Sequence, residues 1–137
     1  MTDRKRILVA DDDADLLDFL KADLTRAGYE VSTVENGRDA LGAILSDHAP
    51  DLVLLDVMLP YVDGYHVAQE AVSTLGDKTP PIIILTCRDA AREKGIAFMS
   101  GASDFIQKPF DIADLRARLT RLLEGARDGQ EGRPPEA

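Results

Sequence analysis

The sequence predicts an α/β domain in which helices cover both faces of a parallel sheet, a doubly wound arrangement. Short apolar runs alternate five times with longer segments of helical pattern, which is typical of successive βα units. The fourth run, residues 82–86, contains only isoleucine and leucine until its final threonine, as expected of a central strand buried on both faces. Because crossover connections between parallel strands are right-handed, a right-handed doubly wound sheet is the economical topology.

Five strands are expected from the apolar runs. The first and third are rich in Ile, Leu and Val, whereas the second alternates polar and apolar residues, as an edge strand does. Each run is bounded by turn residues or by the start of a helical pattern. The expected strands are residues 6–10, 29–34, 52–56, 82–86 and 104–107.

Five helices are expected between and after these strands. In the first, leucines recur every fourth residue along one stripe, and Gly28 is placed to end it. Asn36-Gly37 begins the second helix, and a loop with Pro60 and Asp63-Gly64 leads into the third. The expected helices are residues 14–27, residues 36–47, the segment that closes before Gly76, residues 89–100 and a last helix that begins near residue 111.

The fourth and fifth helices differ in how well their sequences support packing. The fourth contains Gly95, which costs about 1 kcal/mol relative to alanine inside a helix. Its large apolar residues are only Ile96, Phe98 and Met99. We therefore expect this helix to be held loosely and to be a moving part. In the fifth helix, apolar residues recur at spacings of three and four.

Length and composition are those of one globular domain. The 137 residues are 45% hydrophobic and 30% charged, and we expect a domain over residues 1–124. Residues 125–137 combine Gly, Pro and charge without a large apolar side chain, so a disordered tail or linker is expected there. The net charge of −9 argues against direct binding of nucleic acid.

Apolar runs and cysteine content bear on the expected compartment. No apolar run approaches the roughly 20 residues of a membrane span, and no secretory apolar segment follows the charged N-terminus. Cys87 is the only cysteine and has no partner for an internal disulfide. A cytoplasmic location is therefore expected.

Five polar residues lie at the carboxyl ends of the expected strands. Asp11 and Asp12 follow the first strand, Asp56 ends the third, Thr86 ends the fourth, and Lys108 follows the fifth. Because the carboxyl ends of parallel strands meet at one edge of the sheet, we expect these side chains to converge on one crevice. Three carboxylates, a hydroxyl and an ammonium group there suit a hard cation beside a phosphoryl group.

Mg²⁺ is the cation that suits this expected cluster. Close carboxylates repel one another unless a cation or a proton intervenes, and Mg²⁺ takes oxygen ligands in octahedral geometry. Asp13 is a competing ligand, although it is also placed to cap the first helix. Asp51 opens the third strand and is expected at the opposite edge, because five strand residues extend about 16 Å. His48 and His66 are isolated, so nothing indicates zinc.

Four segments together resemble the receiver domain of response regulators, the phospho-accepting half of two-component signalling. The resemblance covers the chain from about Lys5 to Glu124 and is closest in kind to single-domain regulators of the chemotaxis type. It implies a flavodoxin-like fold whose five parallel strands have the order 2-1-3-4-5. The segments are ILVADD at residues 7–12, DLVLLDVMLP at 51–60 with Asp63-Gly64, IILT at 83–86 and GASDFIQKPF at 101–110.

The resemblance also implies a role for each candidate residue. Asp56 would be the phosphoryl acceptor, and Lys108 would pair with the phosphoryl oxygens. Thr86 would hydrogen-bond the phosphoryl group after transfer, and Phe105 occupies the aromatic switch position, where it is equally well interpreted as an ordinary core residue. The implied Mg²⁺ ligands are Asp11, Asp12, Asp56 and the backbone carbonyl of Met58.

Partners and activity follow from the same resemblance. It implies phosphoryl transfer from a sensor histidine kinase or phosphotransfer protein, and control of a target protein through the surface of the fourth helix, fifth strand and fifth helix. The chain would be a monomer or a phosphorylation-dependent dimer, and not a turnover enzyme. Two alternatives stay open, a pseudo-receiver that acts by protein contact without phosphorylation and the receiver half of a longer regulator. A haloacid-dehalogenase-type phosphohydrolase would need a second acid where Met58 stands.

Overall fold

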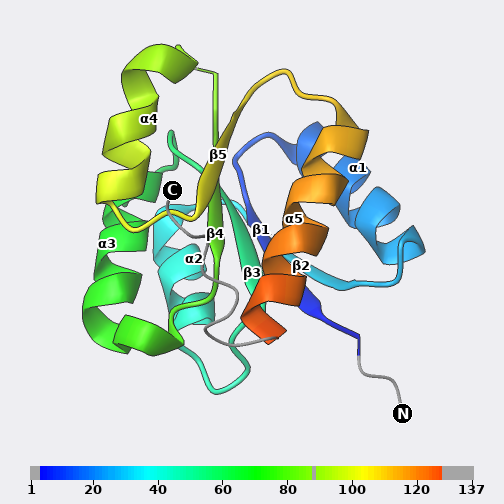
Figure 1. The fold of residues 1–137 in the computed structure, drawn as a ribbon, viewed down its shortest axis with the longest axis horizontal. Helices are drawn as coiled ribbons and strands as arrows, with labels where there is room; N and C mark the ends of the chain where they lie inside the picture. Colours follow the sequence, from blue (N-terminus) through cyan, green and yellow to red (C-terminus); the bar gives the residue numbers. More distant parts are fainter. Residues whose placement is uncertain (1–3, 88, 128–137) are drawn as a thin grey trace.

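Five parallel strands form one sheet with the order β2-β1-β3-β4-β5 in a computed structural model that describes residues 4–87 and 89–127 (Figure 1). The predicted fold class and strand order are confirmed. The strands, which agree with the expected ones to within one residue at each end, are β1 Arg6–Ala10, β2 Glu30–Val34, β3 Leu52–Asp56, β4 Ile82–Thr86 and β5 Asp104–Gln107.

Helices cover both faces of the sheet. Buried leucines of α1 and α5 pack on one face, together with Ile7 and Val9 of β1. Buried residues of α2, α3 and α4 pack on the other face, together with Leu8 and Ala10. The helices are α1 Ala14–Arg26, α2 Gly37–Ile44, α3 Gly64–Leu75, α4 Ala90–Met99 and α5 Ile112–Arg127, and a short 3₁₀ helix, Gly76–Lys78, precedes β4.

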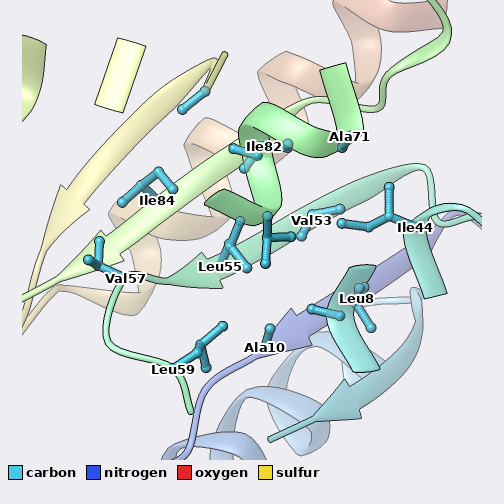
Figure 2. Close-up of a cluster of buried hydrophobic side chains, with 14 of the residues drawn as sticks. Leu8, Ala10, Ile44, Val53, Leu55, Val57, Leu59, Ala71, Ile82 and Ile84 are labelled. Carbon is cyan, nitrogen blue, oxygen red and sulfur yellow. The ribbon is translucent and has the colours of Figure 1, made fainter. Parts of the chain in front are cut away.

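The centre of the sheet is the most completely buried part of the molecule. Every residue of β3 and of β4 is buried, as expected for strands with helices on both sides. Figure 2 shows one of the two apolar layers, in which Val53, Leu55 and Ile82 of the strands meet Ile44 of α2 and Ala71 of α3. Residues at the ends of β3 and β4 therefore project from a rigid support.

Short polar residues begin three of the helices, as their sequences predict. The side chains of Asp13, Asn36 and Asp63 accept backbone hydrogen bonds from the first turns of α1, α2 and α3. At the other end of α1, Gly28 has a φ of 106°, a conformation that favours glycine. These caps fix where each strand-to-helix loop turns back over the edge of the sheet.

Two helix ends differ from those expected. The second helix ends at Ile44 and not near Asp47, because the Ser46 hydroxyl donates a 2.9 Å hydrogen bond to the Ala43 carbonyl and starts a turn. The last helix continues to Arg127, so residues 125–127 extend it beyond the expected boundary. The rest of the expected tail lies outside the described residues. Within residues 4–87 and 89–127, no helix combines the length and apolar character that crossing a membrane requires.

Candidate phosphoryl-acceptor site

Three carboxylates meet at the carboxyl edge of the sheet. Asp11, Asp12 and Asp56 each place one oxygen so that all three lie within 4.8 Å of one another. Asp11 is 1% exposed and Asp56 is 5% exposed, whereas Asp12 is exposed. The cluster thus has two buried acids and one acid that faces solvent.

Strand register brings these acids together. β1 and β3 are neighbours, with Ala10 paired to Leu55, so the residues that follow this pair, Asp11 and Asp56, are adjacent across the sheet. The carboxylate of Asp11 accepts a 3.0 Å hydrogen bond from the backbone N–H of Asp13, which fixes the turn after β1. Asp13 itself caps α1 and is not part of the cluster.

Lys108 supplies the positive charge of the site. Its ammonium nitrogen lies 2.7 Å from an oxygen of Asp11 and 3.4 Å from an oxygen of Asp56. Its backbone N–H donates a 2.7 Å hydrogen bond to the carbonyl of Thr86, which ties the end of β5 to the end of β4. A lysine directly after the last strand therefore reaches two acids at the carboxyl ends of β1 and β3.

The pKa values of the site residues reflect this crowding. Burial raises the pKa of Asp56, and the charge of Asp11 adds to the increase, which Lys108 only partly offsets. Burial alone would lower the pKa of Lys108, but the hydrogen bond and charge of Asp11, followed by Asp56, outweigh it and the pKa is raised. An additional cation would therefore be favourable beside these carboxylates.

The loop after β3 completes one wall of the site. Asp12, Met58, Asp63 and Tyr65 are among the residues that line a cavity of about 440 Å³. Gly64 lies against the backbone of Asp56, where a Cβ atom would clash with the Asp56 carbonyl oxygen. The glycine of the Asp63-Gly64 motif thus allows α3 to begin directly behind Asp56.

Thr86 lies at the carboxyl end of β4, whereas Phe105 lies within β5, paired with Ile84 of β4. Thr86 is fully buried at the end of β4, and Phe105 is 8% exposed within the apolar layer that includes Ala97 of α4. The ring is therefore already inside the protein in this structure, as expected of a core phenylalanine.

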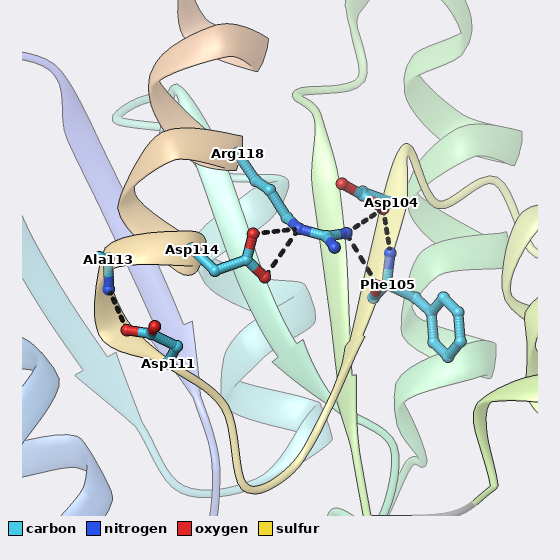
Figure 3. A network of polar contacts seen from close by, with 6 residues as sticks. All are labelled: Asp104, Phe105, Asp111, Ala113, Asp114 and Arg118. Carbon is cyan, nitrogen blue, oxygen red and sulfur yellow. Dashed lines mark hydrogen bonds and ion pairs between the residues drawn. The ribbon is translucent and has the colours of Figure 1, made fainter.

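A polar network, which the sequence did not reveal, holds the backbone of β5 at Phe105. Arg118 of α5 contacts Asp114, Asp104 and, at 3.4 Å, the Phe105 carbonyl, while the Phe105 N–H donates to Asp104 at 2.8 Å (Figure 3). Burial would lower the pKa of Arg118, but its bonds to Asp114 and Asp104 raise it. This network borders a cavity of about 400 Å³ between β5 and α5.

A family match decides the identity of this arrangement. The model of the response regulator receiver domain matches residues 7–120. The chain belongs to the response regulator receiver family. Receiver domains are generally not turnover enzymes, and they generally bind Mg²⁺ at an acidic pocket; the described residues of this receiver include such an acidic cluster.

Similar proteins agree with the assignment. The response regulator MprA of Mycolicibacterium vanbaalenii is 44% identical to this receiver over 118 residues, 86% of the chain and 50% of the relative. The receiver domain of the Francisella response regulator 1452 has a TM-score of 0.83 at 28% identity, over 90% of this chain and 99% of that one. Thermotoga maritima TrrA, solved in complex with Mg²⁺-BeF, has a TM-score of 0.75 at 35% identity, over 86% of this chain and 98% of that one. The chain spans about half the length of the curated relatives it matches.

Sequence reasoning also missed one contact that reaches this receiver's site. The Tyr65 hydroxyl donates a 2.6 Å hydrogen bond to Glu93, which joins the first turn of α3 to the first turn of α4. No sequence pattern signals a pair separated by 28 residues. Asp51, by contrast, lies where expected, at the opposite edge, and accepts a 2.7 Å hydrogen bond from the backbone N–H of Arg6.

Proposed function

We propose that Asp56 accepts a phosphoryl group from a phosphohistidine of a sensor histidine kinase or phosphotransfer protein. The observation that carries this proposal is the buried Asp56 carboxylate, which lies beside Lys108 and two further acids at the carboxyl edge of a receiver sheet. Its strand is fully buried, so the carboxylate is held in place before a donor arrives.

In the proposed reaction, a carboxylate oxygen of Asp56 attacks the phosphorus in line with the phosphorus–nitrogen bond. That bond breaks, its electron pair returns to the imidazole nitrogen of the donor, and the product is an aspartyl phosphate. Lys108 neutralises charge on the transferred oxygens, from a position 3.4 Å from Asp56 before transfer. Later attack by water on phosphorus releases inorganic phosphate and regenerates the carboxylate.

The residues present fit Mg²⁺ as the cofactor of this step. Asp11, Asp12 and Asp56 offer hard oxygen ligands, and the Met58 carbonyl belongs to the loop that shares a cavity wall with Asp12. Bound Mg²⁺ would screen the negative charges of the phosphoryl group and of the acids around it. Burial raises the pKa of Asp56, and the charges of Asp11 and Asp12 raise it further, which supports a cation at this position.

Phosphorylation would act on a target protein through the surface of α4, β5 and α5. A phosphoryl group on Asp56 attracts the Thr86 hydroxyl and Lys108, and Thr86 ends β4 directly before the loop that leads into α4. Phe105 packs in the same layer as Ala97, so movement of α4 changes the space available to its ring. A phosphoryl group that favours the displaced position of α4 increases the population of that arrangement. The affinity of the receiver for its target changes as a result.

Intact-mass measurement with a small phosphodonor tests the proposed function. We expect one added phosphoryl group on the wild-type chain when Mg²⁺ is present, and none without Mg²⁺ or on Asp56→Asn. Asp51→Asn is the matched control, since that acid lies at the opposite edge of the sheet and should leave modification intact. Modification that persists in Asp56→Asn would contradict the assignment, and absence of any adduct would favour a pseudo-receiver.

A further inference from the structure

Helix α4 leaves its large apolar side chains exposed and buries a carboxylate. Among its side chains that the structure describes, only Glu93 and Ala97 are buried, whereas Ile96, Phe98 and Met99 are exposed. A helix on a sheet ordinarily buries an apolar stripe, as α1 does with Leu17, Leu20 and Leu24. Burial of apolar surface therefore contributes less to the position of α4 than to that of α1.

A polar contact joins this helix to its neighbour. Glu93 is 8% exposed, and its carboxylate accepts a 2.6 Å hydrogen bond from the Tyr65 hydroxyl of α3. Hydrogen bonds to a carboxylate are among the stronger ones in proteins, and low exposure protects this one from competition by water. The bond thus attaches the first turn of α4 to the first turn of α3.

Tyr65 belongs to the wall of the acceptor site as well. It lines the same cavity as Asp12 and Met58, and it directly follows Gly64, which lies against the backbone of Asp56. Glu93, at the other end of the hydrogen bond, lies on α4, seven residues after Thr86. The two ends of the bond therefore lie on the two segments that leave the site, one after β3 and one after β4.

We propose that the Tyr65–Glu93 hydrogen bond, here called the latch, holds α4 in its unphosphorylated position. The latch thereby lowers the affinity of the acceptor site for a phosphoryl group. The inference rests on the proposed function of Asp56. A phosphoryl group that draws Thr86 toward Asp56 displaces the start of α4 from α3, and the latch must open. Tyr65 and Glu93 are positioning residues, since they act on the site through the α3 and α4 segments.

Hydrogen exchange on the unmodified full chain tests the latch independently of phosphorylation. We expect amides of α4 to exchange at least threefold faster in Tyr65→Phe and in Glu93→Gln than in the wild type, because local opening no longer breaks this bond. The double variant should exchange no faster than either single variant, since both remove one interaction. Tyr61→Phe, which removes a hydroxyl from a 72% exposed side chain in the loop before α3, should match the wild type.

Titration with beryllofluoride in the presence of Mg²⁺ measures how readily the acceptor site is occupied. A purely structural role of the Tyr65–Glu93 bond would leave this binding unchanged. We expect Tyr65→Phe to be half-saturated at a concentration at least threefold lower than the wild type, because binding no longer opens the latch. Unchanged or weaker binding, or unchanged α4 exchange in both single variants, would overturn the latch. Failure of the wild-type chain to take up beryllofluoride or a phosphoryl group would instead contradict the proposed function.

Discussion

The ammonium nitrogen of Lys108 lies closer to Asp11 than to Asp56, at 2.7 Å against 3.4 Å, although Asp56 is the proposed acceptor. Before transfer the lysine is thus held mainly by an acid of the neighbouring strand. A phosphoryl group on Asp56 would present oxygens that compete with Asp11 for the same ammonium group. The position of Lys108 is therefore a sensitive reporter of the state of the site.

Removal of Lys108 tests how far its charge supports the folded protein. We expect Lys108→Met to lower the free energy of unfolding by about 1–3 kcal/mol without divalent cation, because two buried carboxylates lose their partner. Urea unfolding measures this change, and Lys21→Met on the exposed side of α1 serves as the control. Equal stability of Lys108→Met and the wild type would show that the ion pairs contribute nothing.

Substitution of Asp56 should have a stabilising effect that depends on pH. The pKa of Asp56 is raised in the folded state, so the folded protein binds this proton more tightly than the unfolded chain does. The free energy of unfolding therefore falls as pH rises from the ordinary carboxyl value, about 3.9, through the raised folded value. In metal-free buffer, Asp56→Asn should gain stability over the wild type across that window, and the two should converge below it. A difference that does not vary with pH would contradict this.

Magnesium should stabilise the chain through the acidic cluster. At a hundredfold excess over its Kd, a ligand that binds only the folded state stabilises it by about 2.7 kcal/mol. We expect thermal unfolding of the wild type to shift upward with Mg²⁺, and Asp12→Asn to lose most of this shift. Asp18→Asn, on the exposed face of α1, should keep it. A full magnesium shift in Asp12→Asn would exclude Asp12 as a ligand.

Two glycines with opposite surroundings test the close approach of α3 to the backbone of Asp56. Gly64→Ala should destabilise the protein by about 1–3 kcal/mol and slow phosphorylation, because the new Cβ displaces the Asp56 backbone. Gly42→Ala in α2 meets no atom within 4 Å and should stabilise by about 0.5–1 kcal/mol. Chemical unfolding and intact-mass kinetics measure both effects. If Gly64→Ala kept both the stability and the phosphorylation rate of the wild type, the close contact between Gly64 and the Asp56 backbone would not matter.

Much of the site could be predicted because strand-end positions are visible in the sequence. Apolar runs that end in Asp56 and Thr86, or lead into Asp11 and Lys108, identify the edge at which parallel strands place them. The distinction between Asp51 and Asp56 also followed from strand length alone. Periodicity and strand geometry are local properties, so a single sequence reports them well.

The rotation of α4 about its axis could not be predicted in the same way. The few large apolar residues of this helix are Ile96, Phe98 and Met99, yet all three are exposed, Met99 at 86%. Which side of a short helix faces the sheet depends on the loop that leads into it and on contacts such as that of Glu93 with Tyr65. These are long-range properties, and no spacing within residues 90–99 encodes them.

The proposed acceptor site draws its acids, hydroxyl and lysine from strand ends and the loops that follow, and its carboxylate cluster, among the described residues, includes no residue of a helix. Surface substitutions on the helices can therefore accumulate without disturbing the reaction. Paralogous regulators in one cell could share the same chemistry and still be insulated from one another's kinases and targets. Crosstalk between such pathways would then be controlled by surface residues away from the carboxylate cluster, and rewiring a pathway would need no change at the carboxylates.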